Sequence, residues 1–289
     1  MKRRNILTIF IVFFLFAGVW AIWQNKAIGI TTYEIDCVKN PGLNGFTIVQ
    51  ISDFHNERFG ENQKKILEKI SECNPDMIAV TGDFIDCRRT DVDAAMEFIA
   101  GAVKIAPVYY VPGNHERWVQ EEYDQLCQQM REAGVHLMVN TVEYISYGDG
   151  KIACMGIEDP DFYYVSGEDN KKDAVKNNIE ALEYEESDFT LLLSHRPELF
   201  DIYVEEKLDA VLTGHAHGGQ FRLPFLGGLA APNQGLFPEY DAGMFEKEGT
   251  HMIVSRGLGN SIIPLRINNP PEIVVLKLSL RKEFFEDII

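Results

Sequence analysis

Five short polar blocks, each directly after an apolar run, constrain the fold of this chain more than any other feature. The apolar runs have the length and composition of buried β-strands, and helical patterns lie between most of them. Open α/β sheets collect polar residues outside the carboxyl ends of their strands. The pattern therefore predicts an α/β protein in which five strand ends supply one cleft. The blocks are Asp53-Phe54-His55, Gly82-Asp83-Phe84-Ile85-Asp86, Gly113-Asn114-His115-Glu116, Ser194-His195-Arg196 and Gly214-His215-Ala216-His217.

The residue types in these blocks indicate a metal centre. Five of the seven histidines of the chain lie within them, and only His136 and His251 lie elsewhere. Imidazole and carboxylate are the ligands that Mn²⁺, Fe or Zn²⁺ binds when it must also hold water and phosphate. One carboxylate near one histidine would mean little. Five unrelated polar turns would not explain why all these residues fall at the same end of their strands.

The remaining pattern predicts two packed sheets with helices outside them. A stripe at Ile66, Leu67 and Ile70 predicts a helix that ends near Pro75. Residues 142–157 alternate in polarity like a hairpin, with a glycine-containing turn at 148–150. The strands expected are residues 46–51, 77–80, 108–111, 190–193, 210–212 and 272–278.

Two divalent ions about 3.5–4 Å apart can clamp a phosphoryl group and convert a shared water to hydroxide. Asp83 is the expected bridging ligand, because the tight Gly82-Asp83 turn at a strand end can project it between both ions. His115 follows the expected ligand Asn114 on an extended or turning segment, so it can face substrate, protonate the leaving oxygen or stabilise charge on phosphate. Asp86 is expected to hold that imidazole in position. The alternative for Asp86 is an ordinary helix N-cap.

The N-terminus carries three basic residues followed by an uncharged apolar run, residues 6–23. This run of about 18 residues is just long enough to cross a bilayer as a helix. Its end, with Trp20 and Trp23, suits a membrane interface. A cleaved signal peptide is the main alternative, although its apolar region is normally shorter. Arg3 and Arg4 also faintly resemble a twin-arginine export signal.

The basic residues Lys2, Arg3 and Arg4 favour a cytoplasmic N-terminus. The predicted organisation is a cytoplasmic basic segment (1–5), a transmembrane anchor (6–23), a linker (24–32) and one extracytoplasmic domain (33–289). The chain is expected in the cell membrane as a single-pass protein.

Composition argues against nucleic acid as a partner and against a disulfide-rich scaffold. The formal net charge of −17 disfavours nucleic acid, whose binding depends on basic contacts to phosphate. The five cysteines show neither a C-x-x-C metal pattern nor an even disulfide framework. Most are expected to be buried small side chains, although one extracellular disulfide remains an alternative.

The five blocks together resemble the calcineurin-like metallophosphoesterase superfamily. Further matches in the last third resemble its membrane-associated bacterial branch, which includes twin-arginine-exported phosphoesterases and UDP-diacylglucosamine pyrophosphohydrolase-like proteins. The resemblance covers about residues 30–280 and is more specific for the superfamily than for a substrate. Those matches are residues 214–220 (GHAHGGQ), 221–224 (FRLP), 232–235 (PNQG) and 255–259 (SRGLG).

The resemblance implies a four-layer αββα sandwich and two divalent ions, Mn, Fe or Zn. It implies that His115 is catalytic. The ligands implied for one ion are Asp53, His55, Asp83 and His217, and those implied for the other are Asp83, Asn114, His195 and His215.

One departure from the family pattern bears on substrate. The protein serine/threonine phosphatases carry a phosphate-binding arginine where this chain has Cys87, with Arg88 one residue later. The resemblance therefore implies a membrane-anchored enzyme for phosphodiester or pyrophosphate bonds, with lipid-linked or envelope substrates favoured by the anchor. The alternatives are a broad phosphomonoesterase, a nuclease, which the acidic charge disfavours, and a non-catalytic metal-bearing scaffold. Arg256 is either a phosphate contact or a structural arginine.

Overall fold

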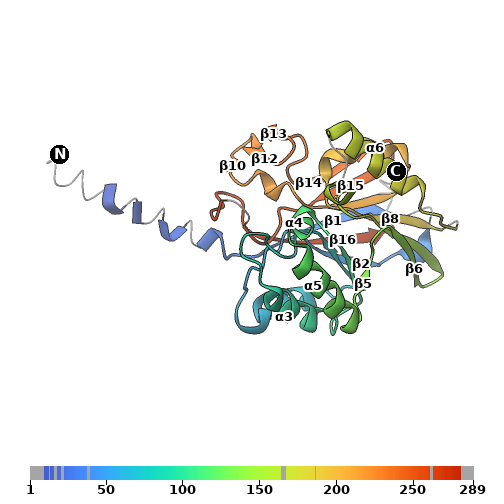
Figure 1. Cartoon of the computed structure of the whole chain (residues 1–289), viewed down its shortest axis with the longest axis horizontal. Helices are drawn as coiled ribbons and strands as arrows, with labels where there is room; N and C mark the ends of the chain where they lie inside the picture. The colour runs from blue at the N-terminus through green and yellow to red at the C-terminus, as the bar shows by residue number, and fades with distance from the viewer. Residues whose placement is uncertain are drawn as a thin grey trace, which may run out of the picture.

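Two six-stranded sheets face each other at the centre of the molecule (Figure 1). The computed structural model describes residues 10–12, 14–15, 18–20, 23–37, 40–163, 167–185, 187–260 and 263–280. The first sheet has the order β1 (Gly29–Asp36), β16 (Glu272–Ser279), β2 (Thr47–Ile51), β3 (Met77–Thr81), β4 (Val108–Val111) and β5 (His136–Leu137). The second has the order β14 (Gly243–Lys247), β15 (Thr250–Val254), β9 (Ala210–Thr213), β8 (Phe189–Leu193), β7 (Gly150–Gly156) and β6 (Thr141–Tyr147).

Helices cover the outer face of each sheet. The first sheet packs on α2 (Lys64–Glu72), α3 (Val92–Ala102) and α5 (Gln120–Glu132) through a core that includes Ile78, Phe98 and Leu126. The second packs on α6 (Glu168–Glu180) and α7 (Phe200–Glu205) through a core that includes Val211 and Tyr203. The described residues form a mixed α/β sandwich, which confirms that part of the predicted fold class and leaves its N-terminal transmembrane helix a prediction.

A third apolar core lies between the sheets and fixes their spacing. Ile48, Met77 and Ala79 on the first sheet face Leu191 and Leu212 on the second, and all five are fully buried. Strands β2, β3 and β4 run parallel to one another, as do β7, β8 and β9. Parallel strands covered on both faces read as continuous apolar runs, which explains the sequence pattern. Their carboxyl ends lie at the same edge.

The predicted strands are present with small shifts at their ends, and β6 and β7 form the predicted antiparallel hairpin. Two local expectations were wrong. Residues 29–32, expected in a linker, belong to β1, which is held by parallel pairing with the distant strand β16. Asn114 and His115, expected on an extended or turning segment, open the short helix α4 (Asn114–Trp118). All five cysteines are free, and Cys37, Cys127 and Cys154 are buried.

The described residues between 10 and 24 are helical and mostly exposed, and Figure 1 shows this N-terminal segment leading away from the domain. Among the described residues, no helix reaches the length and apolarity that a membrane crossing requires. Lys2, Arg3 and Arg4 lie outside the described residues, as does part of the predicted anchor.

Candidate metal centre

Each of the five predicted blocks lies at the carboxyl end of a strand, and all five blocks meet in one place. Asp53 follows β2, Asp83 follows β3 and Asn114 follows β4 on the first sheet. His195 follows β8 and His215 follows β9 on the second sheet. The site therefore spans the edges of both sheets, as the position of the polar blocks predicted.

Five of the seven predicted ligands have a backbone in the left-handed region, with φ between 47° and 63°. Such residues cost about 1–3 kcal/mol each and persist only where the surroundings hold them. Here backbone hydrogen bonds join neighbouring turns, for example from Asp53 N to Gly82 O (3.0 Å) and from His55 N to Asp83 O (3.1 Å). The strained residues are Asp53, His55, Asp83, His215 and His217.

Close backbone approach requires glycine at Gly82. A Cβ atom there would lie 2.5 Å from His195 Nδ1 and 2.8 Å from the backbone of Gly113, and the φ of Gly82 is +84°. Any larger residue would separate the turn after β3 from His195. The glycine before Asp83 is thus part of the site's geometry.

The first group of possible metal ligands is Asp53, His55, Asp83 and His217. His55 Nε2 lies 3.2 Å from His217 Nε2, and His217 Nε2 lies 3.4 Å from Asp53 Oδ1. His55 Nε2 lies 3.7 Å from Asp83 Oδ2. All four side chains are buried.

The second group is Asp83, His195 and His215. His195 Nε2 lies 3.3 Å from Asp83 Oδ2, while His195 Nδ1 is 2.8 Å from the carbonyl oxygen of Thr81. Nδ1 therefore donates to that carbonyl, which directs Nε2 toward Asp83 and the site; a metal that displaced the proton of Nε2 could bind there. Asp83 belongs to both groups, which is the position expected of a bridging carboxylate.

These distances fit a bound divalent ion. Ligand atoms about 2.0–2.2 Å from one ion, at angles of roughly 90–110°, lie about 3–3.5 Å apart. The contacts of His217 with His55 and Asp53 and the contact of His195 with Asp83 fall in that range. His195 Nε2 and Asn114 Oδ1 are buried and have no hydrogen-bond partner among the described residues. Buried polar atoms are normally paired, so both atoms are available to a metal.

The protonation of the imidazoles follows from burial and from neighbouring charge. Burial, with Arg196 nearby, holds the pKa of His215 well below its usual value, and burial with His55 nearby does the same for His217. Those two rings are neutral and can bind a metal. For His195 burial acts in the same direction, but the carboxylate of Asp83 outweighs it and raises the pKa to about 10.

His115, the predicted catalytic residue, is held by a backbone group. The N–H of Cys87 donates to His115 Nδ1 (3.1 Å), so the neutral ring carries its proton on Nε2. Nε2 lies 3.9 Å from Asp83 Oδ2 and therefore points toward the candidate metal ligands. Burial lowers the pKa of His115 to about 4.

Asp86 faces two imidazoles. Its Oδ2 atom is 3.5 Å from His55 Nδ1 and 3.8 Å from His115 Nδ1, beyond ordinary hydrogen-bond distance from His115. Its Oδ1 atom accepts from the backbone N–H groups of Arg88 and Arg89 (2.9 and 3.0 Å). The cap of α3 is Asp91, so the alternative of a helix N-cap is wrong for Asp86. That Asp86 positions His115 stays a prediction. The hydrogen bond that the structure gives to His115 Nδ1 comes from the N–H of Cys87.

Glu116 is a functional residue that the sequence analysis missed, although it lies directly after His115. Its buried carboxylate accepts four backbone hydrogen bonds, from the N–H groups of Gly113 (2.7 Å), Asp83 (3.0 Å), Phe84 (2.7 Å) and Ile85 (3.0 Å). Burial first, and then the charge of Asp83, raise its pKa to about 7. Glu116 joins the turn after β3 to the turn after β4, and it thereby positions Asp83.

Arg196 and Asn233 support the second group, and neither role was evident from the sequence. Arg196 lies in the block Ser194-His195-Arg196 and Asn233 in the match at residues 232–235. The partners of both residues come from distant segments of the chain. Arg196 is buried, pairs with Asp159 through two nitrogens, and donates from Nη1 to Asn233 Oδ1 (2.9 Å). Asn233 Oδ1 also lies 2.9 Å from His215 Nε2. When Nε2 donates to Asn233, Nδ1 of His215 is left for a metal.

A cavity of about 550 Å³ opens over the candidate ligands. Arg256 does not line it, and Arg256 Nε lies 3.7 Å from Glu272 Oε1, so this arginine has a structural position. Arg88, by contrast, lines the cavity next to Cys87. The lining of the cavity combines cationic with apolar side chains, among them Arg88, Lys171, Arg196, Trp118, Ala230 and Ile263.

Comparisons with known proteins identify the family of the chain. The sequence profile of the calcineurin-like phosphoesterases matches residues 46–219. The uncharacterized metallophosphoesterase YkuE of Bacillus subtilis is 31% identical over 244 residues, which cover 82% of this chain and 80% of the relative. The phosphodiesterase YaeI of Escherichia coli is 28% identical over 238 residues, covering 81% and 82%. Among solved structures, the sulfate thiohydrolase SoxB of Thermus thermophilus shares the fold, with a TM-score of 0.50 and 12% identity over 82% of this chain and 57% of that chain.

The fold and the His/Asp cluster define a metal-dependent phosphoester hydrolase. The chain belongs to the calcineurin-like phosphoesterase family. This confirms the predicted superfamily and, at the level of a metal-dependent phosphoester hydrolase, the predicted enzyme class.

We expect Glu116→Gln to destabilise the domain by about 2–4 kcal/mol, because the amide NH₂ would face two backbone donors that the carboxylate now accepts. Metal affinity should fall about 10–100-fold as the turn that carries Asp83 relaxes. Chemical unfolding and metal titration of the full chain measure both effects. The matched control is Glu122→Gln, the same change at an exposed position of α5, which should stay within about 0.5 kcal/mol of wild type. Equal stability of the two variants would contradict the role of Glu116.

Proposed function

We propose that this protein is a membrane-anchored phosphoesterase that hydrolyses phosphodiester or pyrophosphate bonds with two bound divalent ions, Mn, Fe or Zn. The observation that carries the proposal is the position of Asp83, whose Oδ2 atom faces His55 in one group of ligands and His195 in the other. A carboxylate shared in this way is what a two-metal centre requires.

The residues present fit such a centre. One ion would be held by Asp53, His55, Asp83 and His217, and the other by Asp83, Asn114, His195 and His215. When bound, the two ions would supply a hydroxide near neutral pH and neutralise charge on the phosphoryl oxygens. The buried Oδ1 atom of Asn114, which has no hydrogen-bond partner among the described residues, supports this assignment.

His115 is proposed to act on the reacting phosphate. The Cys87 N–H holds Nδ1, so the Nε2–H group points to the side of the site where Asp83 lies. From there Nε2–H can donate to the leaving oxygen or to a phosphoryl oxygen as negative charge develops. The Trp118 ring, 5.1 Å from the His115 ring, is exposed at the cavity.

The cavity favours a substrate that combines phosphate with an apolar group. Arg88, Lys171 and Arg196 can meet anionic oxygens, whereas Trp118 and Ile263 can meet an apolar leaving part. A lipid-linked or envelope phosphodiester or pyrophosphate has both features. The relative YaeI is named a phosphodiesterase, which supports this bond type. The suspected kinship with UDP-diacylglucosamine pyrophosphohydrolase-like proteins belongs to the same proposal.

The anchor is proposed to be residues 6–23, with residues 1–5 in the cytoplasm and the domain outside the membrane. The apolar run after three basic residues supports this topology. A relative from Danio rerio, 27% identical over 95% of this chain and 63% of its own length, is named a transmembrane protein with a metallophosphoesterase domain. That name supports membrane association.

Two alternatives make different demands on the same site. A broad phosphomonoesterase would hydrolyse small monoesters as fast as diesters. A non-catalytic scaffold would bind metal without turnover. The buried His115 in contact with the Cys87 N–H favours catalysis over the scaffold.

We expect His115→Ala to lower kcat by about 10²–10⁴-fold while both metals are retained, because its role lies in the transition state. Asp83→Ala should lose metal and activity together, because Asp83 serves both groups. Elemental analysis after metal reconstitution, with kcat on bis-p-nitrophenyl phosphate, measures both. Fewer than one equivalent of metal in the wild type would contradict the two-metal centre. Retained metal and full turnover in both variants would contradict the assignment of the residues.

Phosphodiesters and pyrophosphates should be hydrolysed faster than phosphopeptides. The side chain of Cys87 cannot replace the arginine that clamps a doubly charged monoester in the protein phosphatases. The measurement is kcat/KM for bis-p-nitrophenyl phosphate, a lipid pyrophosphate and a phosphopeptide under one metal condition. A phosphopeptide preference above roughly tenfold, about 1.4 kcal/mol, would support a protein phosphatase instead.

Protease added to intact cells, after removal of any outer wall, should digest the domain and leave the N-terminal segment in the membrane. The reason is the basic cluster before the apolar run, which stays on the cytoplasmic side. A cytoplasmic marker protein must remain undigested as the control. Protection of the domain would reverse the topology, and a mature protein that starts after Trp23 would indicate a cleaved signal.

A further inference from the structure

The most exposed apolar side chains of the domain gather on one element, residues 221–238, which we term the apolar ribbon. It consists of two short hairpins, β10 (Arg222–Leu223) with β11 (Gly227–Gly228) and β12 (Ala230–Ala231) with β13 (Gly235–Leu236). Phe225, at the turn of the first hairpin, is fully exposed. Leu226, Leu236 and Phe237 are 67%, 71% and 58% exposed. Large apolar side chains that gather on one exposed surface mark a site of interaction with a protein partner or a membrane.

The ribbon carries almost no charge. From Leu223 to Pro238 the chain has no Asp, Glu, Lys or Arg, although charged residues make up 25% of the whole sequence. The one charged residue of the ribbon, Arg222, is neutralised by Asp241 at 2.9 Å. An exposed and uncharged surface is suited to the boundary between lipid headgroups and acyl chains.

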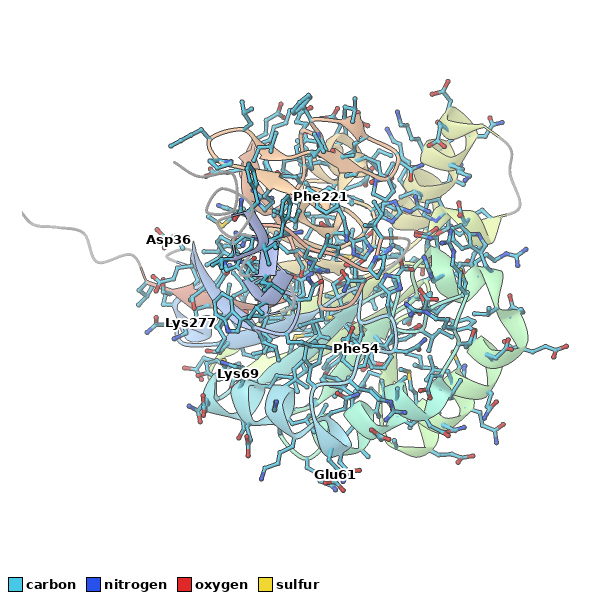
Figure 2. The ribbon with its side chains drawn as sticks, turned by 90° about the vertical axis from the view of Figure 1, so that its left-hand side faces the viewer. Asp36, Phe54, Glu61, Lys69, Phe221 and Lys277 are labelled. Carbon is cyan, nitrogen blue, oxygen red and sulfur yellow. The ribbon has the colours of Figure 1, made fainter. Side chains whose placement is uncertain are left out.

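The ribbon and the N-terminal segment leave the domain next to each other. Gln220, at the base of the ribbon, donates to the carbonyl oxygens of Ile263 (2.8 Å) and Leu265 (2.7 Å). Asn25, at the end of the N-terminal segment, accepts from Arg266 N (3.1 Å) and Asn260 Nδ2 (3.3 Å). Both elements are therefore tied to neighbouring parts of one stretch, residue 260 and residues 263–266. Figure 1 shows β10, β12 and β13 on the side from which the N-terminal segment departs, and Figure 2 places Phe221 on that side.

The ribbon also borders the cavity over the candidate metal centre. Ala230, Ala231, Pro232 and Asn233, which form β12 and the start of the turn after it, line that cavity. A membrane that received Phe225 and Phe237 would consequently lie beside the opening through which substrate reaches the ligands.

We propose that the apolar ribbon is a second membrane contact, which enters the lipid headgroup and acyl-chain boundary beside the anchor and directs the cavity toward the bilayer. This proposal depends on one part of the proposed function, namely the membrane anchor. A lipid bilayer fits better than a protein partner, because the exposed side chains of the ribbon are Leu and Phe, it has no Tyr or Trp, and its one arginine is paired with Asp241. Continuity with the apolar N-terminal segment favours the same partner.

The first test uses the full chain reconstituted into phosphatidylcholine vesicles. The photo-reactive residue benzoylphenylalanine replaces Phe225 or Phe237 in turn. As a control it replaces Tyr184, an aromatic residue that is 44% exposed and lies in the connection between α6 and β8. Figure 1 shows α6 and β8 away from the N-terminal segment. Illumination should yield phospholipid adducts at the two ribbon positions at least about tenfold above the control. The yield should not change between about 0.05 and 0.5 M NaCl, because no charge is involved.

The outcomes separate this proposal from the anchor. A wild-type protein that fails to float with the vesicles would contradict the anchor and the ribbon contact together. A protein that floats but gives equal adducts at Phe225 and Tyr184 would contradict the ribbon contact alone. Adducts to a second copy of the chain, in place of lipid, would assign the ribbon to self-association and overturn the proposal.

A second test measures the consequence for turnover. The double variant Phe225→Asp with Leu236→Asp should lower hydrolysis of a vesicle-embedded lipid pyrophosphate on the order of tenfold, since the cavity loses its local concentration of lipid. Hydrolysis of soluble bis-p-nitrophenyl phosphate should stay unchanged, because neither residue lines the cavity. Tyr184→Asp is the matched control. An equal loss on both substrates would show damage to the fold and would count against the ribbon as a separate membrane contact.

Discussion

The carboxylate of Asp83 is the feature on which the rest of the site depends. Its Oδ2 atom lies 3.7 Å from His55 Nε2 and 3.3 Å from His195 Nε2, so one side chain connects the two groups of ligands. Asp83 stands in a left-handed turn after an inner strand, and Glu116 accepts the backbone N–H groups of that turn. A shift of the turn would displace the carboxylate from both groups at once. The stability of the turn and the geometry of the centre are therefore set by the same hydrogen bonds.

The site concentrates negative charge that water does not reach. Asp53, Asp83, Asp86 and Glu116 are all buried, and buried carboxylates are costly unless they are paired. In the absence of an ion, the pairing falls on imidazole: despite burial, Asp83 raises the pKa of His195 to about 10. A divalent ion would supply that positive charge and release the proton. The same buried carboxylates that would repel one another without a cation would thus make this a strong site for one.

The sequence predicted the site better than it predicted the surroundings of the site. Asp53, Asp83 and His215 could be found because each follows an apolar strand, and that relation is local. The strand β1 could not be found, because it exists through pairing with β16, more than 200 residues away. The role of Glu116 was not predicted for a related reason. An acidic residue after His115 is indistinguishable in sequence from a surface residue, and only the fold brings the turn after β3 into contact with it. Long-range partners decide these roles, and one-dimensional patterns do not contain them.

The apolar ribbon and the acidic surface together restrict how the domain can approach a membrane. With a net charge of −17, most faces of the protein would be repelled by anionic headgroups. The uncharged stretch from Leu223 to Pro238 avoids that repulsion, and it lies beside the segment that would hold the chain in the bilayer. Because Asn233 of the ribbon contacts His215, the element that meets lipid is also in contact with a candidate metal ligand. The ribbon therefore joins the proposed membrane contact to the cavity over the two groups of ligands, because residues 230–233 line that cavity.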